Sequence, residues 1–396
     1  MNTPHPAHPS PRPLGPVETL FAAYNDTGAM QFSIAVELEG EVHGNRWDQA
    51  MHAIADLHPT FGALLAYDKD GRRSFIPGAP PISFVIEHCD RPGWHDALSA
   101  SVNTVLPPGA APMRARLLAD GARQLLIATF VHAAADGMSA LRVVEDILTL
   151  VAGATLPVRA TPSLDEALGM DVGRFWHEDR PAAGEHTVAP IHLDALELDE
   201  AETRRFTEAA RQHDTTLNSA LVVAFGEVLS VTRAGQGVRI MSPVNVRQQT
   251  GGTDASAVHI SVAVSNVGAP ATDFWESAHG VHDTIKAARH PAAVRGFVER
   301  LASGMREDPT NAATSLRIGR ASVFDAILSH LGDVRFDGLV PSAPRVVNVW
   351  GPVIRPLPGL SIIGANRFAS GLRLVSTSFD PAPLLRPVLE HLKARL

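Results

Sequence analysis

Cysteine and lysine are almost absent from this sequence. Of 396 residues, only Cys89 is a cysteine, and only Lys69, Lys286 and Lys393 are lysines. A lone cysteine cannot form a disulfide within the chain, and a single thiol is more often incidental than nucleophilic. Arginine supplies nearly all of the positive charge, and no run of Lys and Arg occurs. With a net charge of −8 and a pI near 6.1, the chain lacks the clustered cations that nucleic acid or an anionic membrane would require.

The sequence also lacks an uninterrupted apolar stretch long enough to cross a membrane. The longest such run, 217–229, is interrupted by Glu227 and predicts a buried helix instead. Residues 1–12 are rich in proline and histidine without an apolar segment, which predicts a disordered lead-in rather than a signal peptide. Together with the single cysteine, these absences predict a cytoplasmic protein that does not bind membranes.

Several common site patterns are missing as well. The serine-hydrolase pattern Gly-x-Ser-x-Gly does not occur, and 235–237 (Gly-Gln-Gly) lacks the third glycine of a dinucleotide-binding loop. Two pairs of side chains have metal-ligand chemistry, His132 with Asp136 and His279 with His282. Neither pair has an evident third ligand, so no metal site is predicted, and the second pair is most simply a solvated helix face.

Hydrophobic periodicity divides the chain into two halves with a similar order of helices and strands. Between them, proline and glycine accumulate and the periodicity is lost, which is typical of a linker. At 396 residues and 45% hydrophobic, the chain is long enough to bury two cores. The predicted organisation is a lead-in (1–12), an N-terminal lobe (13–152), a linker (153–188) and a C-terminal lobe (189–396).

The same patterns predict individual elements in each half. Strands are expected at 31–40, 61–67, 73–76, 82–86, 112–119, 123–131, 189–194, 237–243, 257–266, 344–349, 359–365 and 370–378. Helices are expected at 46–58, 93–104, 137–151, 199–212, 216–231, 272–289, 291–304 and 320–331, with a last helix from Ala382.

The most informative segment is His-Ala-Ala-Ala-Asp-Gly at 132–137. The apolar, β-branched run before it predicts a strand and the periodic run after it predicts a helix, so the segment forms a strand-to-helix turn. Such a turn can present His132 to a cavity while Asp136 points back to hold the loop and Gly137 lets the chain bend. Because imidazole titrates near the working pH, His132 is a candidate general base. A hydrogen-bonded core histidine is the alternative.

This segment resembles the His-His-x-x-x-Asp-Gly motif of the condensation-domain and HxxxD acyltransferase superfamily, with Val131 in place of the first histidine. Other segments resemble further parts of that family in the same order, covering roughly residues 13–394, and they are most similar to the polyketide-associated, free-standing acyltransferases. These segments are 13–21, 32–40, 47–59, 216–225, 242–247 and 346–351.

The resemblance implies an α/β fold of two chloramphenicol-acetyltransferase-like lobes, arranged as a V-shaped pseudo-dimer with a tunnel between them. It implies that His132 is the catalytic general base and that Asp136, paired with an arginine at Arg247, supports the site together with Gly137. It also suggests Asn348 and Trp350 as residues that line the tunnel.

The reaction implied by the resemblance is transfer of an acyl group from a thioester to a hydroxyl, or less readily an amine, of a small natural-product acceptor. The co-substrate would be acyl-CoA or an acyl carrier protein, and no cofactor would be bound permanently. Because a chain with both lobes completes its own site, a monomer is expected. The alternative function is a condensation- or cyclase-like enzyme, or a non-catalytic module that docks a carrier protein.

Overall fold

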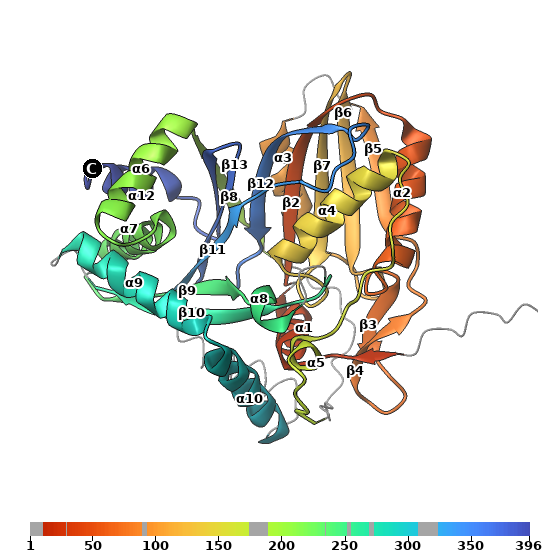
Figure 1. Ribbon diagram of the computed structural model, residues 1–396, viewed down its shortest axis with the longest axis horizontal. Coiled ribbons are helices and arrows are strands. Elements are labelled where there is room, and N and C mark those ends of the chain that lie inside the picture. Colours follow the sequence, from red (N-terminus) through yellow and green to blue (C-terminus); the bar gives the residue numbers. More distant parts are fainter. Residues whose placement is uncertain are drawn as a thin grey trace, which may run out of the picture.

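The computed structural model describes residues 11–28, 30–88, 93–173, 189–233, 235–251, 255–268, 273–307 and 324–396. Within these ranges the chain forms two α/β lobes, each built on a large β-sheet, which stand side by side in Figure 1. The predicted lead-in falls almost wholly outside the described residues, as do Cys89 and the 174–188 part of the predicted linker.

The first lobe is a five-stranded sheet of order β12-β2-β7-β6-β5. Its central strand reads as a near-continuous apolar run because helices cover both faces, with α2 and α4 packed on one side and α3 on the other. The bounds are β2 (Gln31–Glu39), β5 (Ser83–His88), β6 (Met113–Asp120), β7 (Arg123–Val131), β12 (Arg345–Ile354), α2 (Gly44–Leu57), α3 (Trp94–Asn103) and α4 (Gly137–Val151).

Strand β12 corrects the predicted lobe boundaries. The sequence assigns all of 189–396 to the second lobe, but β12 pairs antiparallel with β2 in the sheet of the first lobe. Without β12, the buried strand β2 would be a sheet edge with unpaired backbone N–H and C=O groups. The second half of the chain therefore completes the sheet of the first half, and the two lobes are joined by a shared strand.

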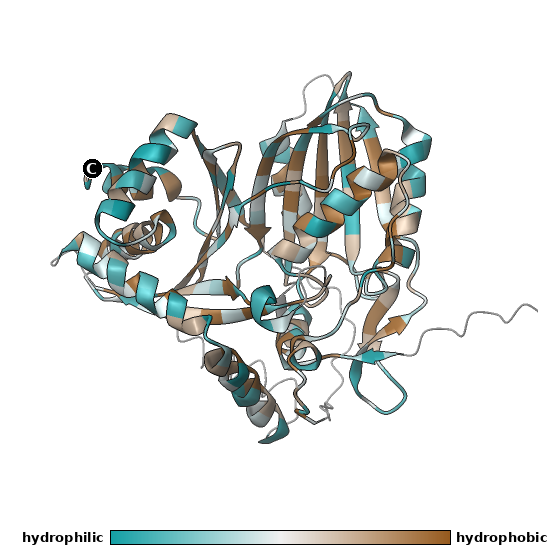
Figure 2. Cartoon of the chain, in the orientation of Figure 1, coloured by the Kyte–Doolittle hydropathy of each residue, from teal (hydrophilic) through white to brown (hydrophobic). Residues whose placement is uncertain are grey.

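The second lobe is a six-stranded sheet of order β10-β9-β11-β13-β14-β8, with the apolar helix α7 packed against it. Apolar residues gather on the strands and polar residues on the outer faces of the helices (Figure 2). The bounds are β8 (His192–Leu198), β9 (Val238–Asn245), β10 (Ile260–Val267), β11 (Ala326–Asp333), β13 (Ser361–Phe368), β14 (Gly371–Ser378), α6 (Glu200–Gln212), α7 (Leu217–Thr232), α9 (Phe274–Ala288), α10 (Pro291–Glu307) and α12 (Leu385–Lys393).

The predicted order of strands and helices is confirmed except at 320–331, where a helix is expected and the described part forms strand β11. This strand runs parallel to both β9 and β13, so it is central in the sheet and its first residues, Ala326 to Ser329, are all buried. A strand buried on both faces has no alternation of polar and apolar residues. Its short apolar run therefore cannot be distinguished from a buried helix by periodicity.

The remaining described elements are short, apart from the first helix. Helix α1 (Pro16–Gly28) of the first lobe packs against α10 of the second lobe. The short elements are β1 (Arg12–Pro13), β3 (Ala63–Tyr67), β4 (Arg73–Pro77), α5 (Leu164–Ala167) and α8 (Arg247–Thr250).

In the described ranges, no single helix is long and apolar enough to cross a membrane, although α6 and α7 together pass that test of length and composition across a 93° bend.

Candidate active site

His132 lies directly after β7, at the start of the turn that leads into α4. Its backbone N–H donates to the carbonyl of Met30 at 2.9 Å, which extends the pairing of β7 with β2 by one residue. Four residues later, Asp136 is the N-cap of α4, and its Oδ1 accepts the backbone N–H of Ser139 at 2.9 Å. The turn is therefore fixed at both ends, as the segment 132–137 predicts.

The imidazole of His132 is held between aromatic rings. It stacks on Phe21 of α1, with ring centroids 4.2 Å apart and planes 10° apart, and it contacts the Phe32 ring at 4.8 Å. The residue is 9% exposed, and burial lowers the pKa of His132 below its ordinary 6.5, against the smaller opposing effects of nearby carbonyls and the Asp136 carboxylate. The ring is therefore neutral near pH 7.

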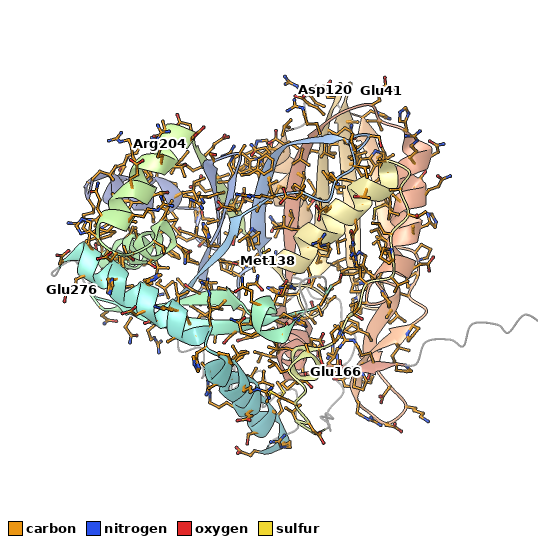
Figure 3. The ribbon with its side chains drawn as sticks, in the orientation of Figure 1. Glu41, Asp120, Met138, Glu166, Arg204 and Glu276 are labelled. Atoms are coloured by element: carbon orange, nitrogen blue, oxygen red, sulfur yellow. The ribbon has the colours of Figure 1, made fainter. Side chains whose placement is uncertain are left out.

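His132 lines a cavity of about 980 Å³ that lies between the two lobes. The first lobe contributes α1, β2 and the 132–138 turn to its wall, and the second lobe contributes β9, β10, β11, α9 and α10. Met138, at the start of α4, marks the junction of the lobes in Figure 3. Most side chains of the wall are apolar, so the cavity can hold an extended apolar group beside the imidazole.

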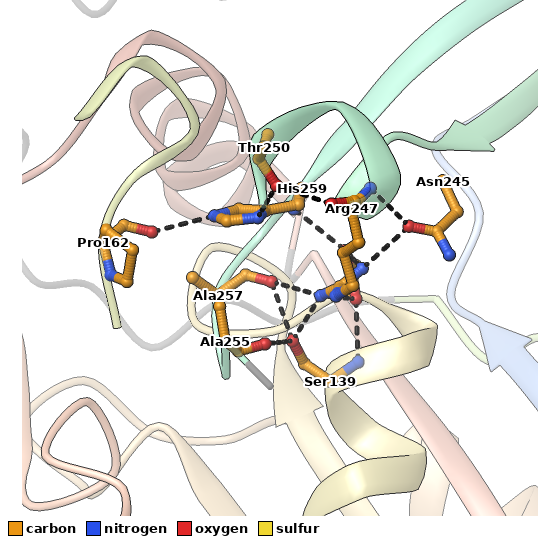
Figure 4. A network of polar contacts seen from close by, with 9 residues as sticks. Ser139, Pro162, Asn245, Arg247, Thr250, Ala255, Ala257 and His259 are labelled. Atoms are coloured by element: carbon orange, nitrogen blue, oxygen red, sulfur yellow. Dashed lines mark hydrogen bonds and ion pairs between the residues drawn. The ribbon is translucent and has the colours of Figure 1, made fainter. Parts of the chain in front are cut away.

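Asp136 and Arg247 form a buried ion pair that joins the two lobes. Figure 4 shows Arg247 among its neighbours Ser139, Ala257 and His259. The guanidinium donates to both carboxylate oxygens at 2.8 Å, and it also donates to Ser139 Oγ at 2.8 Å and to the carbonyl of Ala257 at 2.9 Å. The backbone N–H of His259 donates to Asp136 Oδ2 at 2.9 Å. We call this set the interlobe clamp.

The clamp keeps Asp136 ionised although the residue is 2% exposed. Burial alone would raise the pKa of Asp136, but the adjacent Arg247 and the N–H groups of Ser139 and His259 outweigh that effect and lower it. With four hydrogen bonds accepted, this carboxylate has no role left in proton transfer. It holds the turn that carries His132.

Gly137 lies close to a side chain of the second lobe. A Cβ at this position would lie 2.5 Å from Cδ2 of Leu331, on β11. The glycine is therefore explained by the space that it leaves for a neighbouring side chain, rather than by a left-handed backbone conformation. Val131, in the position of the first motif histidine, is buried in the core of the first lobe and does not line the cavity.

A second buried polar cluster connects the two lobes, and it was not evident from the sequence. His58, the C-cap of α2, has Nδ1 2.6 Å from Ser256 Oγ and Nε2 3.1 Å from Asp146 Oδ2, and Arg159 pairs with Asp146 at 2.7 Å. The residue types are those of a Ser-His-Asp triad. Because His58 and Ser256 have no exposed surface and lie outside the cavity wall, the set fixes the 255–259 segment to the first lobe.

Asn348 and Trp350 do not line the cavity, which corrects the expectation from the sequence. Trp350 stacks on Trp94 of α3, with centroids 4.1 Å apart, and its Nε1 donates to Glu37 at 2.7 Å. Asn348 accepts a hydrogen bond from Arg373 at 2.8 Å. The register of β12 shifts between Trp350 and Val353, and the strand lines the cavity only from Pro352 onward.

In the part of the chain that the structure describes, no group of three His, Cys, Asp or Glu side chains could hold a metal ion. His279 is an exposed side chain 3.6 Å from Asp283, as a solvated helix face predicts. His282 differs from that prediction, because it is half-buried and lines the cavity.

Comparisons with known proteins match this chain at the level of structure. No protein-family model and no curated protein sequence matches it. Among solved structures, polyketide synthase associated protein 5 from Mycobacterium tuberculosis has a TM-score of 0.67 at 14% identity, covering 98% of this chain and 97% of that one. The first condensation domain of the CDA synthetase has a TM-score of 0.69 at 14% identity, covering 98% and 96%.

A third similar structure is F. graminearum TRI101 complexed with coenzyme A and T-2 mycotoxin, with a TM-score of 0.67 at 12% identity over 98% of this chain and 97% of that one. At such low identity the likeness establishes the fold. The chain has the two-lobed, chloramphenicol-acetyltransferase-like fold that it shares with the condensation domain and these other two proteins.

Proposed function

We propose that this protein is an acyltransferase that moves an acyl group from a thioester to a hydroxyl or amine of a small acceptor, with His132 as general base. The observation that carries the proposal is the imidazole of His132 in the wall of a large, mostly apolar cavity between the lobes, where burial also lowers its pKa. A hydroxyl acceptor is favoured over an amine. The protein would act as a cytoplasmic monomer.

The chemistry requires one nitrogen of His132 that can take and return a proton. Nδ1 is enclosed and, among the described residues, has no hydrogen-bond partner, which leaves Nε2 to meet the substrate. Nε2 would accept the proton of the acceptor O–H or N–H as that atom attacks the thioester carbonyl. When the tetrahedral intermediate collapses, the C–S bond breaks and the departing thiolate takes the proton back. No acyl-histidine is needed.

The interlobe clamp supports this role by positioning. Proton transfer depends on the imidazole lying within hydrogen-bond reach of the acceptor, and Asp136 holds the turn through Arg247 and the cap of α4. The donor would be acyl-CoA or an acyl carrier protein. The similar structure of TRI101, which is complexed with coenzyme A and T-2 mycotoxin, supports a thioester donor and a small-molecule acceptor.

The test compares wild type with His132→Ala for thiol release from a series of acyl-CoAs, with and without candidate alcohols. We expect His132→Ala to lower kcat/KM by about 100-fold or more, and His279→Ala, which removes an exposed histidine outside the cavity wall, to leave it unchanged. Equal unfolding midpoints would show that both variants are folded. Turnover by His132→Ala within about threefold of wild type would exclude general-base catalysis by this residue, and a silent wild type would favour the docking alternative.

A further inference from the structure

Helices α9 and α10 place a group of cations on the wall of the cavity. Lys286 lies on α9 and Arg289, three residues later, is the C-cap of that helix, on the side that also carries His282. Arg300 lies on the cavity face of α10. All three cations are exposed where the cavity meets solvent. We call Lys286, Arg289 and Arg300 the cation rim.

The cation rim has no partner within the protein as far as the structure describes it. Among the described residues, none of its side chains makes an ion pair or a hydrogen bond. The other ionised side chains of the described wall, Asp136 and Arg355, are buried and already hydrogen-bonded to protein groups. In a chain with a net charge of −8, three positive charges without a partner among the described residues therefore lie at one opening of this cavity.

Apolar side chains lie next to these cations on the same helices. Ile285 separates His282 from Lys286, and Phe297 and Leu301 flank Arg300. A ligand that satisfies both features has an apolar or neutral arm that reaches inward and an anionic group that stays at the opening. A pantetheine arm ending in a phosphate has this chemistry, and both thioester donors considered above carry one.

We propose that the cation rim binds the phosphate groups of the donor's phosphopantetheine, so that the thioester reaches His132 from the α9–α10 side of the cavity. This inference rests on the proposed function and adds to it the direction from which the donor enters. Guanidinium groups bind phosphate oxygens in a bidentate manner and the ammonium group acts as a point charge, so binding weakens with salt.

The test measures the affinity of the full chain for CoA, 4′-phosphopantetheine and pantetheine by calorimetry. The variant Lys286→Gln/Arg289→Gln/Arg300→Gln is expected to bind CoA about 10-fold more weakly or worse, from three contacts of modest strength each. Its pantetheine affinity should not change. A matched control, Arg46→Gln/Lys69→Gln/Arg386→Gln, removes the same charge from exposed residues outside the cavity wall and should bind CoA as wild type does.

The outcomes separate the two donor sources. If the triple variant loses equal affinity for CoA and for 4′-phosphopantetheine, the cation rim binds the phosphate that CoA shares with carrier proteins. If it loses affinity for CoA alone, the rim binds the nucleotide end of CoA. Equal CoA affinity in the two triple variants, or wild-type affinity for CoA that does not fall with salt, overturns the inference. Because these titrations measure binding alone, failure of the catalytic proposal would be seen in the turnover of His132→Ala and not in the comparison of the two triple variants.

Discussion

Breaking the interlobe clamp should cost a large part of the stability of the protein. Arg247→Met removes the guanidinium but keeps an apolar side chain of similar length, which leaves Asp136 ionised, buried and unpaired. Removing one partner of such a pair costs about 3–5 kcal/mol. Since domains of this kind are stable by only about 5–15 kcal/mol, the loss should be obvious in a denaturation curve.

Asp136→Asn tests the interlobe clamp by changing its carboxylate instead of its guanidinium. Each carboxylate oxygen accepts one bond from Arg247 and one from a backbone N–H, of Ser139 or of His259. An amide would point its NH₂ group at two of these donors, so we expect a loss of about 3 kcal/mol or more. The double variant should lose less than the sum of the two, because neither charge is then left unpaired, with a coupling of about 1–3 kcal/mol.

The assay is urea unfolding followed by the fluorescence of the five tryptophans. Arg204→Met is the matched control, because Arg204 lies 3.9 Å from Glu200 in a pair that is more than half exposed, and it should change the free energy of unfolding by less than about 0.5 kcal/mol. A result for Arg247→Met within about 1 kcal/mol of wild type, or strictly additive losses in the double variant, would refute the clamp as the joint between the lobes.

Two further predictions concern packing and pH. Gly364→Ala should lower the free energy of unfolding by about 3 kcal/mol or more, because the new Cβ would lie 1.9 Å from the backbone oxygen of Pro352 on β12. The control is Gly280→Ala, in an open position on α9, which should be neutral or stabilising by up to about 1 kcal/mol. Comparable urea midpoints for the two variants would contradict this prediction. Burial, then Arg367, lowers the pKa of His330 from 6.5 to about 4. As the pH falls, the unfolded chain protonates His330 before the folded chain does, so stability present above pH 6.5 is lost towards pH 4, by up to about 3 kcal/mol. His330→Asn should flatten the curve of unfolding free energy against pH over that range. An unchanged curve would exclude His330 as a source of acid sensitivity.

The sequence is most informative where local chemistry marks the ends of an element. Strand β7 and helix α4 have the bounds that the pattern predicts, because a β-branched run ends at the motif and Asp136 provides a helix cap. The pairing of Asp136 with Arg247 is implied only by family resemblance. No local pattern links two residues that are 111 positions apart.

The sequence-based predictions that the structure corrects failed for physical reasons that a single sequence does not reveal. The buried strand β11 has no alternation to separate it from a helix. Trp350 points away from the cavity because it lies on the face of β12 that packs against α3, and a single sequence does not show which face of this strand meets that helix. In the same way, β12 joins the other lobe's sheet because β2 needs a partner, which is a property of the assembled fold.

The residues that sequence reasoning missed lie on separate elements. The cation rim contains no run of Lys and Arg, because its members come from the C-terminal end of α9 and from α10. Only the spacing of Lys286 and Arg289 gives a faint helical signal. His58 and Ser256, 198 positions apart, meet only when the lobes assemble.

The central claim is that the imidazole of His132 takes the proton from the acceptor, and the pH dependence of kcat/KM tests it most directly. Because burial lowers the pKa of His132, the rate in wild type should stay level from pH 8 down past 6.5 and fall only below that value. The residual activity of His132→Gln should lack this fall. An acidic fall that persists unchanged in His132→Gln, or one centred above pH 6.5 in wild type, would contradict the claim.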